Sequence, residues 1–321
     1  TTALAATRNF TVGGETVNKA NWTNSAGTAS YNDSDGVLTL TDYTGGSIVT
    51  DRSLTIKLIG NNTVTADKTC NNATNNFCGI GPTDSWARIT ITGPGSLTVN
   101  ANGSIGSSSQ DYGYGITGGT GAVAIKDSAS VTVNVSNFTG GNYAIYSGNF
   151  TTTSSGALTL NVTKTGYDSN RLVGIYANGP VSLGGSGAKA ITLDGGGTNA
   201  IGIYSYNSKE VAVTGGDLTI TNKQSSSGTG IAAGKIDLNA NVTINNVNIG
   251  MESTASSSNG PISITGDNNI NITTDSGSAI VTRGDLTITG NPVITATRTS
   301  TYTNADGGSV VSVNGGKSDI N

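Results

Sequence analysis

The strongest constraint on how this chain can fold is an internal repeat. Three short apolar motifs recur along most of its 321 residues, always in the same order. The first motif reads Gly-Ile or Ala-Ile, often followed by tyrosine, and the other two are short runs of alternating apolar and polar residues. A repeat of this kind indicates that one structural unit is copied along the chain.

We call the three sets of equivalent apolar positions columns A, B and C. Column A contains Ile48, Ile80, Ile116, Ile145, Ile175, Ile203, Ile231, Met251, Ile280 and Val310. Column B contains Leu54, Ile89, Val123, Phe150, Val181, Val211, Ile236, Ile262 and Leu286. Column C contains Val64, Leu97, Val131, Leu158, Ile191, Leu218, Val242, Ile270 and Val293. Column A advances 200 residues in seven steps between Ile80 and Ile280, or about 29 per step, and columns B and C give nearly the same period.

This pattern predicts an all-β fold, a single parallel β-solenoid with three strands per coil and about nine coils. Each motif has the length and alternation of a half-buried strand, and clusters of Gly, Asn, Asp and Ser supply the turns. One coil cannot bury its apolar side, but stacked coils share a continuous core. A right-handed β-helix is expected only because that hand is the commoner one. A pair of β-sandwiches would also contain many short strands, but it would not explain the fixed order of the three motifs.

Residues 1–45 do not fit the repeat, so we predict an N-terminal cap there and a β-helix over residues 46–321. An uncovered solenoid end exposes strand edges, which a cap would protect. The strand expected at Val37–Leu40 follows a polar turn at residues 32–36 and belongs to this cap. At the other end the chain stops inside what should be column B, so we expect the natural protein to continue.

The composition excludes several classes of function. Histidine is absent, which rules out a Ser-His-Asp triad, a Cys-His pair and histidine metal sites. The formal charge of −4 argues against nucleic acid as a partner. No run of 18 apolar residues occurs, so we expect no membrane insertion. We also expect no cofactor and no bound metal.

The chain contains two cysteines, Cys70 and Cys78, with seven residues of a polar, Asn-rich loop between them. Two lone cysteines this close together suggest a local disulfide and therefore an oxidising compartment, although two reduced thiols would also fit. The sequence opens Thr-Thr-Ala without an initiator methionine. We read it as a mature secreted chain or as part of a longer protein.

Outward-facing residues of column C are expected to form two polar lanes along the solenoid, because side chains alternate across a strand. The first lane contains Thr98, Thr132, Thr159, Thr192, Thr219, Thr243 and Asn271. The second contains Asn100, Asn134, Asn161, Asp194, Thr221, Asn245 and Thr273. Such lanes are typical of a solvent-facing surface with high β-propensity. They also loosely resemble the threonine ladders of ice-binding solenoids, from which the second lane departs.

Column A places Tyr146, Tyr176 and Tyr204 directly after the isoleucine in three consecutive coils. Exposed tyrosines suit glycan binding, because a ring can stack on a sugar while the hydroxyl hydrogen-bonds to it. Stacked tyrosines also simply stabilise a ladder of strands. We predict these three residues as the ligand-binding site and leave the structural alternative open.

An enzyme that degrades polysaccharides is the alternative function. Glycoside cleavage needs two carboxyl groups about 5–9.5 Å apart. Asp194, Asp237 and Glu252 fall in different columns, and no cluster of acids with Lys or Arg is apparent in the sequence. The sequence therefore predicts no catalytic residue.

Several segments resemble the opening of secreted cell-surface proteins of Gram-positive bacteria. They are Trp22 with the run from Tyr31 to Tyr43, the run from Leu54 to Val64, Cys78-Gly79-Ile80, and the run from Ile89 to Val99, in that order. The resemblance implies a pectate-lyase-like β-helix within a larger adhesin or carbohydrate-binding protein. We accordingly predict an extracellular, non-enzymatic surface adhesin or stalk, whose partner is a glycan on a host or neighbouring cell.

Overall fold

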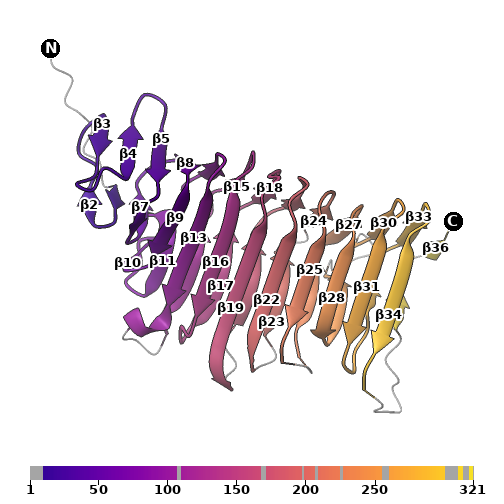
Figure 1. The fold of residues 1–321 in the computed structure, drawn as a ribbon. Helices are drawn as coiled ribbons and strands as arrows, with labels where there is room; N and C mark the ends of the chain where they lie inside the picture. The colour runs from indigo at the N-terminus through magenta and orange to yellow at the C-terminus, as the bar shows by residue number, and fades with distance from the viewer. Residues whose placement is uncertain are drawn as a thin grey trace.

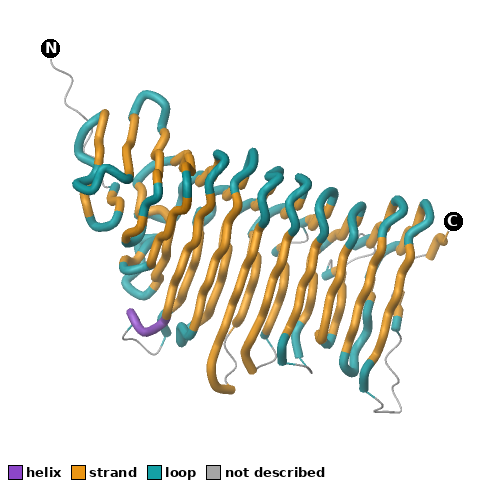
Figure 2. Tube along the Cα trace, viewed as in Figure 1, coloured by secondary structure: helices purple, strands orange, loops and turns teal. Residues whose placement is uncertain are grey.

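The chain folds into an elongated stack of β-coils with three long sheets (Figure 1). The structure, a computed structural model, describes residues 10–106, 110–167, 171–196, 199–206, 209–224, 227–254, 260–300, 310–313 and 318–320. Strands and connecting loops account for nearly all of these residues, and a single turn of 3-10 helix at Gly103–Ile105 interrupts them (Figure 2). No helix among the described residues is long and apolar enough to cross a membrane.

The three sheets correspond to the three sequence columns, and we name them accordingly. Sheet A contains β1 (Thr11–Val12), β2 (Glu15–Thr16), β7 (Ile48–Thr50), β10 (Lys68–Thr69), β11 (Asn76–Pro82), β14 (Tyr112–Thr117), β17 (Gly141–Ser147), β20 (Arg171–Ala177), β23 (Ala200–Ser205), β26 (Thr229–Ala233), β29 (Ile249–Ser253), β32 (Ile280–Thr282) and β35 (Val311–Val313). Sheet B contains β3 (Asn21–Thr23), β4 (Ala29–Asn32), β5 (Val37–Thr41), β8 (Leu54–Ile59), β12 (Ile89–Thr92), β15 (Val123–Ile125), β18 (Phe150–Thr152), β21 (Val181–Leu183), β24 (Glu210–Val213), β27 (Lys235–Leu238), β30 (Ile262–Thr265), β33 (Leu286–Thr289) and β36 (Ser318–Ile320). Sheet C contains β6 (Thr44–Gly45), β9 (Asn61–Thr65), β13 (Ser96–Asn102), β16 (Ser130–Ser136), β19 (Leu158–Tyr167), β22 (Lys189–Gly196), β25 (Leu218–Asn222), β28 (Val242–Val247), β31 (Asn269–Thr274) and β34 (Val293–Arg298).

The predicted parallel solenoid is confirmed. The chain visits sheets A, B and C in turn, and each strand pairs in parallel with the strand of the same sheet in the next coil. In the described part of the chain this gives nine complete coils, from β7–β8–β9 to β32–β33–β34, followed by β35 and β36. Stacking therefore satisfies the backbone hydrogen bonds between coils, as expected for a solenoid.

The strand register confirms most of the sequence columns and corrects four positions. Every member of column B lies in register with its neighbours. In column A, Ile280 pairs with Val311 rather than Val310. In column C, Ile294 replaces Val293. The two remaining errors in column C share one cause, because a buried polar residue fills a position where the sequence suggests an apolar one.

Those two polar residues are Asn62 and Lys189. Leu97 pairs with Asn62 rather than Val64, and Leu158 pairs with Lys189 rather than Ile191. The Asn62 side chain accepts a hydrogen bond from the backbone N–H of Tyr43 (2.9 Å), so its polar group is satisfied. Lys189 is 3% exposed, and burial lowers the pKa of its ammonium group.

The Lys189 ammonium group lies among backbone carbonyl groups. Its Nζ donates to the carbonyl oxygens of Gly187 (2.8 Å), Gly215 (2.5 Å) and Gly185 (3.2 Å). These partners compensate for the loss of water around a buried cation, which would otherwise be costly.

The core is one continuous apolar cluster that runs along the stack and contains inward side chains from all three sheets. Ile145, Phe150 and Leu160, one from each sheet of the fourth coil, are all fully buried. Burying such a side chain contributes about 1.5–3 kcal/mol relative to leaving it exposed.

A small residue precedes the isoleucine of column A in almost every coil because the core leaves no room for a larger one. The position is occupied by Gly79, Gly115, Ala144, Gly174, Gly202, Gly230 and Gly250. A Cβ atom on Gly202 would lie 2.7 Å from Cγ2 of Ile220 in sheet C and 2.5 Å from the carbonyl oxygen of Gly230. This residue and the following apolar residue of column A therefore both face the interior, so alternation is interrupted once in each of these strands.

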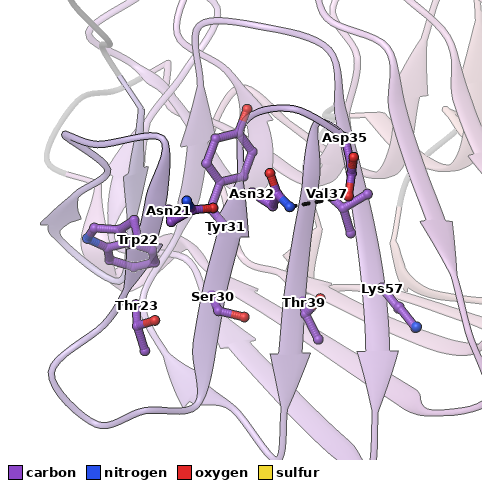
Figure 3. Close-up of a pocket in the computed structure, with 10 residues that line it drawn as sticks. All are labelled: Asn21, Trp22, Thr23, Ser30, Tyr31, Asn32, Asp35, Val37, Thr39 and Lys57. Carbon is purple, nitrogen blue, oxygen red and sulfur yellow. Dashed lines mark hydrogen bonds between the residues drawn. The ribbon is translucent and has the colours of Figure 1, made fainter. Parts of the chain in front are cut away.

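The N-terminal strands extend sheets A and B by antiparallel pairing. In sheet B, β3 pairs with β4 and β4 with β5, while β5 joins the first coil by parallel pairing with β8. Trp22 and Tyr31 turn inward and close the end of the core. The opposite, outer face of these four strands carries mostly polar side chains (Figure 3). The predicted boundary at residue 45 falls at the end of β6, which already pairs in parallel with β9.

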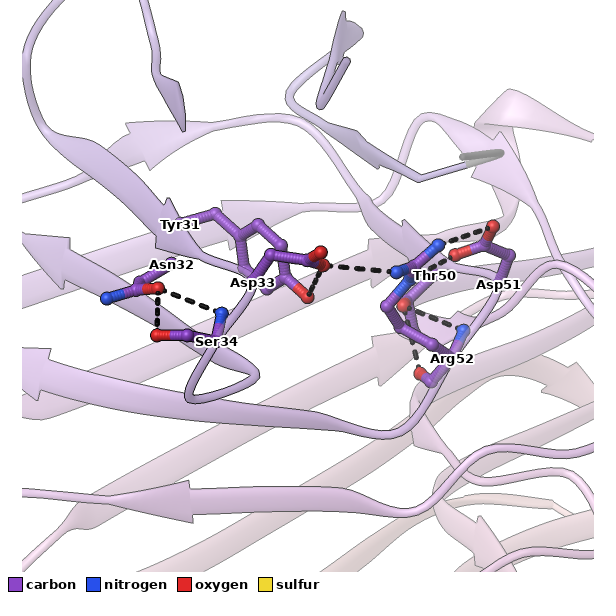
Figure 4. A network of polar contacts seen from close by, with 7 residues as sticks. All are labelled: Tyr31, Asn32, Asp33, Ser34, Thr50, Asp51 and Arg52. Atoms are coloured by element: carbon purple, nitrogen blue, oxygen red, sulfur yellow. Dashed lines mark hydrogen bonds and ion pairs between the residues drawn. The ribbon is translucent and has the colours of Figure 1, made fainter. Parts of the chain in front are cut away.

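Arg52 ties this N-terminal region to the first coil (Figure 4). Its guanidinium donates to both carboxylate oxygens of Asp51 (2.7 and 3.1 Å) and also lies 3.2 Å from the carboxylate of Asp33 in the turn between β4 and β5. The Tyr31 hydroxyl donates to the same Asp33 oxygen (3.2 Å). The polar turn at residues 32–36 is thus held by side chains of the protein itself.

The expected disulfide between Cys70 and Cys78 is not formed, and both residues are buried free thiols. Strands β10 and β11 pair antiparallel with Lys68 opposite Cys78, while the backbone N–H of Cys70 donates to the carbonyl of Asn76 (2.8 Å). The cysteines therefore occupy diagonal rather than directly opposite positions of this hairpin. Burial raises the pKa of the Cys78 thiol, and hydrogen bonding to Cys70 raises it further.

Candidate functional site

The outer face of sheet A carries an aromatic cluster that spans four consecutive coils. We call it the tyrosine surface, and it consists of Tyr112, Tyr114, Tyr143, Tyr146, Tyr176, Tyr204 and Tyr206. It includes the three residues predicted from the sequence, and the register places Tyr146, Tyr176 and Tyr204 side by side on β17, β20 and β23.

The rings of the tyrosine surface pack against one another. Tyr146 and Tyr176 are stacked, with ring centroids 5.0 Å apart and planes within 9° of parallel. Tyr204 is tilted by 54° relative to Tyr176 at 5.3 Å, and Tyr206 lies 6.1 Å from Tyr204. In an offset stack each ring covers part of its neighbour's face. The ring faces of Tyr204 and Tyr206 are therefore covered less by neighbouring rings than the ring faces of Tyr146 and Tyr176 are.

Two further tyrosines form the base of this cluster. Tyr114 and Tyr143 are only 8% and 6% exposed, and they stack with centroids 5.3 Å apart. They face outward because the small residue after each of them points into the core. Strict alternation from the isoleucine would have turned them inward, so they could be recognised only as near the predicted site in sequence and not as part of it.

Burial keeps the deeper hydroxyl groups neutral well beyond physiological pH. It raises the pKa of Tyr176 to about 12, with the neighbouring Tyr146 and Tyr204 adding to the effect. Burial also raises the pKa of Tyr114 and Tyr143, although Arg171 beside Tyr143 lowers the latter in part. These hydroxyls act as neutral hydrogen-bond donors and acceptors rather than as acids or nucleophiles.

The row of aromatic side chains ends at Tyr204. The register continues from Tyr204 to Ala232 and then to Glu252, so a methyl group and a carboxylate follow the row of rings. Tyr206, the most exposed member at 44%, lies at this same end of the cluster. The most accessible aromatic area is therefore next to a small residue rather than in the middle of the row.

The polar lanes on the outer face of sheet C also form, with one shift. Thr98, Thr132 and Thr159 lie in register in the first lane, but Ala190 takes the place predicted for Thr192. Thr192 instead pairs with Asn161 in the second lane, and Asp194 pairs with Thr163 beyond it.

Amide groups link the second lane across coils. Asn134 Nδ2 donates to Asn100 Oδ1 (2.8 Å), and Asn161 Nδ2 donates to Asn134 Oδ1 (2.9 Å). These side chains therefore satisfy part of one another's hydrogen-bonding capacity along the solenoid.

Sheet B brings together a charged group that the sequence columns did not reveal. Glu210 pairs with Lys235 on the neighbouring strand, and Lys235 Nζ lies 2.5 Å from Asp237 Oδ2 and 3.4 Å from Glu210 Oε1. Interaction with the neighbouring Asp237 carboxyl group raises the pKa of Glu210, and burial adds to the effect.

Trp86 is an exposed aromatic residue that the sequence reasoning passed over. It lies between β11 and β12 and forms an isolated bridge with Gly119. Its only sequence signal was the rarity of tryptophan in the chain.

Comparisons with known proteins add no assignment. No protein-family model, curated protein or solved structure matches the chain. Among the described residues, no group of three or more Cys, Asp or Glu side chains is arranged to hold a metal ion.

Proposed function

We propose that this chain is part of an extracellular bacterial surface protein and serves as an adhesin or stalk that binds glycans through the tyrosine surface. The observation that carries the proposal is the row of partly exposed rings on β17, β20 and β23, which continues to the exposed Tyr206. Aromatic rings with hydroxyl groups suit the apolar faces and hydroxyls of sugars.

The architecture supports this role in two ways. A solenoid holds its side chains at a fixed spacing of about 4.8 Å per coil, so the rings are arranged before a ligand arrives. The neutral hydroxyls match an uncharged polyol better than a phosphate or a cation. Within the row, the orientation of the rings favours Tyr204 and Tyr206 as the stacking residues, because Tyr146 and Tyr176 partly cover each other.

A glycan array tests the proposal. We expect the wild-type chain to bind a restricted set of glycans and the combined Tyr146→Ala, Tyr176→Ala and Tyr204→Ala variant to lose that binding by more than tenfold, since it removes the stacking ring of Tyr204 and the rings that pack beside it. The far-ultraviolet circular dichroism spectrum should stay the same.

The matched control replaces Thr132, Thr159 and Thr219 on sheet C with alanine and should leave glycan binding intact. A Tyr→Phe version of the triple variant keeps the rings and removes only the hydroxyls, so it separates stacking from hydrogen bonding. Unchanged binding by the Tyr→Ala variant would remove the tyrosine surface from the proposal.

Two alternative functions make different predictions. A polysaccharide-degrading enzyme would release reducing ends or unsaturated products in a broad substrate screen. Glu210 and Asp237 would then be the first carboxyl groups to replace, because sheet B brings them together. An ice-binding protein would use the threonine lane and would produce thermal hysteresis, which the sheet C alanine variant would abolish.

A further inference from the structure

A polar pocket of about 470 Å³ lies on the outer face of the N-terminal strands (Figure 3). It is on sheet B and is therefore separate from the tyrosine surface on sheet A. Four strands, β3, β4, β5 and β8, supply its floor. Trp22, Tyr31 and Asp35 also contribute to its lining, and the register arranges the other lining side chains in two rows across these strands. One row is Asn21, Asn32 and Val37, and the other is Thr23, Ser30, Thr39 and Lys57.

The polar side chains of this pocket differ in whether they hydrogen-bond to other groups of the protein. At one end, Asn32 donates to the Asp35 carboxylate (3.3 Å) and accepts a hydrogen bond from the backbone N–H of Ser34 (3.0 Å). By contrast, the other polar side chains of these two rows have no hydrogen-bond or ion-pair partner within the described part of the chain. These free groups are Asn21, Thr23, Ser30, Thr39 and Lys57.

We propose that this pocket binds a saccharide that carries a carboxylate group. The free amide and hydroxyl groups can each donate and accept, as the hydroxyls of a sugar require. A volume of about 470 Å³ lies within the usual range for small-ligand sites. Lys57 is an unpaired cation at the edge of the pocket, and it would pair with a single carboxylate. A phosphate-rich ligand carries more negative charge, so it would need further cations and Asp35 would repel it more strongly than a single carboxylate.

The assignment leads to a test with two sugars that differ in one group. Saturation-transfer nuclear magnetic resonance and calorimetry on the whole chain would compare D-glucuronic acid with D-glucose. We expect glucuronic acid to bind at least about tenfold more tightly, because a charge-assisted hydrogen bond to Lys57 is available only to the acid. The Lys57→Met variant should reduce the affinity for glucuronic acid to that for glucose.

The solenoid provides a matched control for Lys57. Lys126 follows Ile125, which is in register with Ile91 and Ile56, so it occupies the same lane of sheet B two coils away and is also exposed. The Lys126→Met variant should retain the preference for the acid, and so should the triple tyrosine variant. A Thr39→Val variant should weaken the binding of both sugars, since Thr39 lines the pocket beside Lys57.

Three outcomes would overturn the proposal. The first is no binding of either sugar by the wild-type chain, and the second is an equal loss in the Lys57 and Lys126 variants, which would indicate general attraction of anions. The third is loss of glucuronic acid binding only in the tyrosine variant, which would place the ligand on sheet A. Because the pocket and the tyrosine surface are tested by separate variants, either proposal can fail without the other.

Discussion

The outer faces of sheets C and A begin from the same alternation of side chains but become different surfaces. On sheet C, Thr98, Thr132 and Thr159 stand in register, and the asparagines beside them are linked by amide hydrogen bonds. On sheet A, the strands carry an aromatic cluster in which Tyr114 and Tyr143 are nearly buried under their neighbours.

One position in each coil explains the difference. The small residue before the isoleucine of column A faces the core, so sheet A has two consecutive inward positions, and the residue before them is turned outward. Strands β13 and β16 of sheet C have no such pair of consecutive inward positions, so the lanes on this sheet follow simple alternation. The surface that a solenoid presents therefore depends on packing inside it as much as on the outward residues themselves.

The first and largest test of this comparison is the Gly202→Ala substitution on sheet A. Its new Cβ would lie too close to Ile220 and to the carbonyl of Gly230, so the core must shift. We expect a loss of about 2–3 kcal/mol in the free energy of unfolding, measured by urea denaturation.

Ala144→Gly is the matched control, because Ala144 occupies the equivalent position and already fits. It should cost no more than about 1 kcal/mol, chiefly through the greater entropy of the unfolded chain. Equal stability of Gly202→Ala and the wild type would show that the small residues do not determine how sheet A is built.

An intermediate effect is expected at alkaline pH, again on sheet A. Burial raises the pKa of Tyr176 to about 12, so the unfolded chain loses this proton at a lower pH than the folded one. The stability linked to Tyr176 is therefore fully present below about pH 10 and is lost as the pH rises toward 12. The urea midpoint should fall over this range, while tyrosinate absorbance from the buried rings appears only with unfolding.

The Tyr176→Phe variant sharpens this test, because it keeps the ring and removes the ionisable group. Its urea midpoint should decline less steeply over the same pH range than that of the wild type. An identical decline in both chains would mean that Tyr176 ionises equally well in the folded state.

The solenoid could be predicted from the sequence because apolar residues recur at equivalent positions in every coil. Column B was placed correctly throughout the described coils, since its strands are short and uninterrupted. Column C failed at Asn62 and Lys189, where backbone partners allow a polar side chain inside. Part of each set of partners, Gly215 for Lys189 and Tyr43 for Asn62, comes from a neighbouring coil that is distant in sequence, so no local pattern reveals the whole set.

The candidate sites divide in the same way. Tyr146, Tyr176 and Tyr204 follow the isoleucine of column A and could be aligned by counting. Tyr143 could not be placed, because its direction depends on how tightly sheet C packs against Ala144. The pocket beside Lys57 was also missed, since antiparallel pairing of β3, β4 and β5 brings its rows together outside the repeat.

The smallest expected effect concerns the amide ladder of sheet C, where Asn134 bonds to both Asn100 and Asn161. Asn134→Ala removes both hydrogen bonds, but the groups left behind are only partly buried and can bind water. We therefore expect a loss of about 1 kcal/mol, measured by urea denaturation. Thr132→Ala, on the same strand but in the first lane, should change stability by less than about 0.5 kcal/mol. If the two variants were equally stable, the amide ladder would not contribute to the free energy of unfolding. The stability of sheet C, like that of sheet A, would then depend chiefly on the packing of its core side chains.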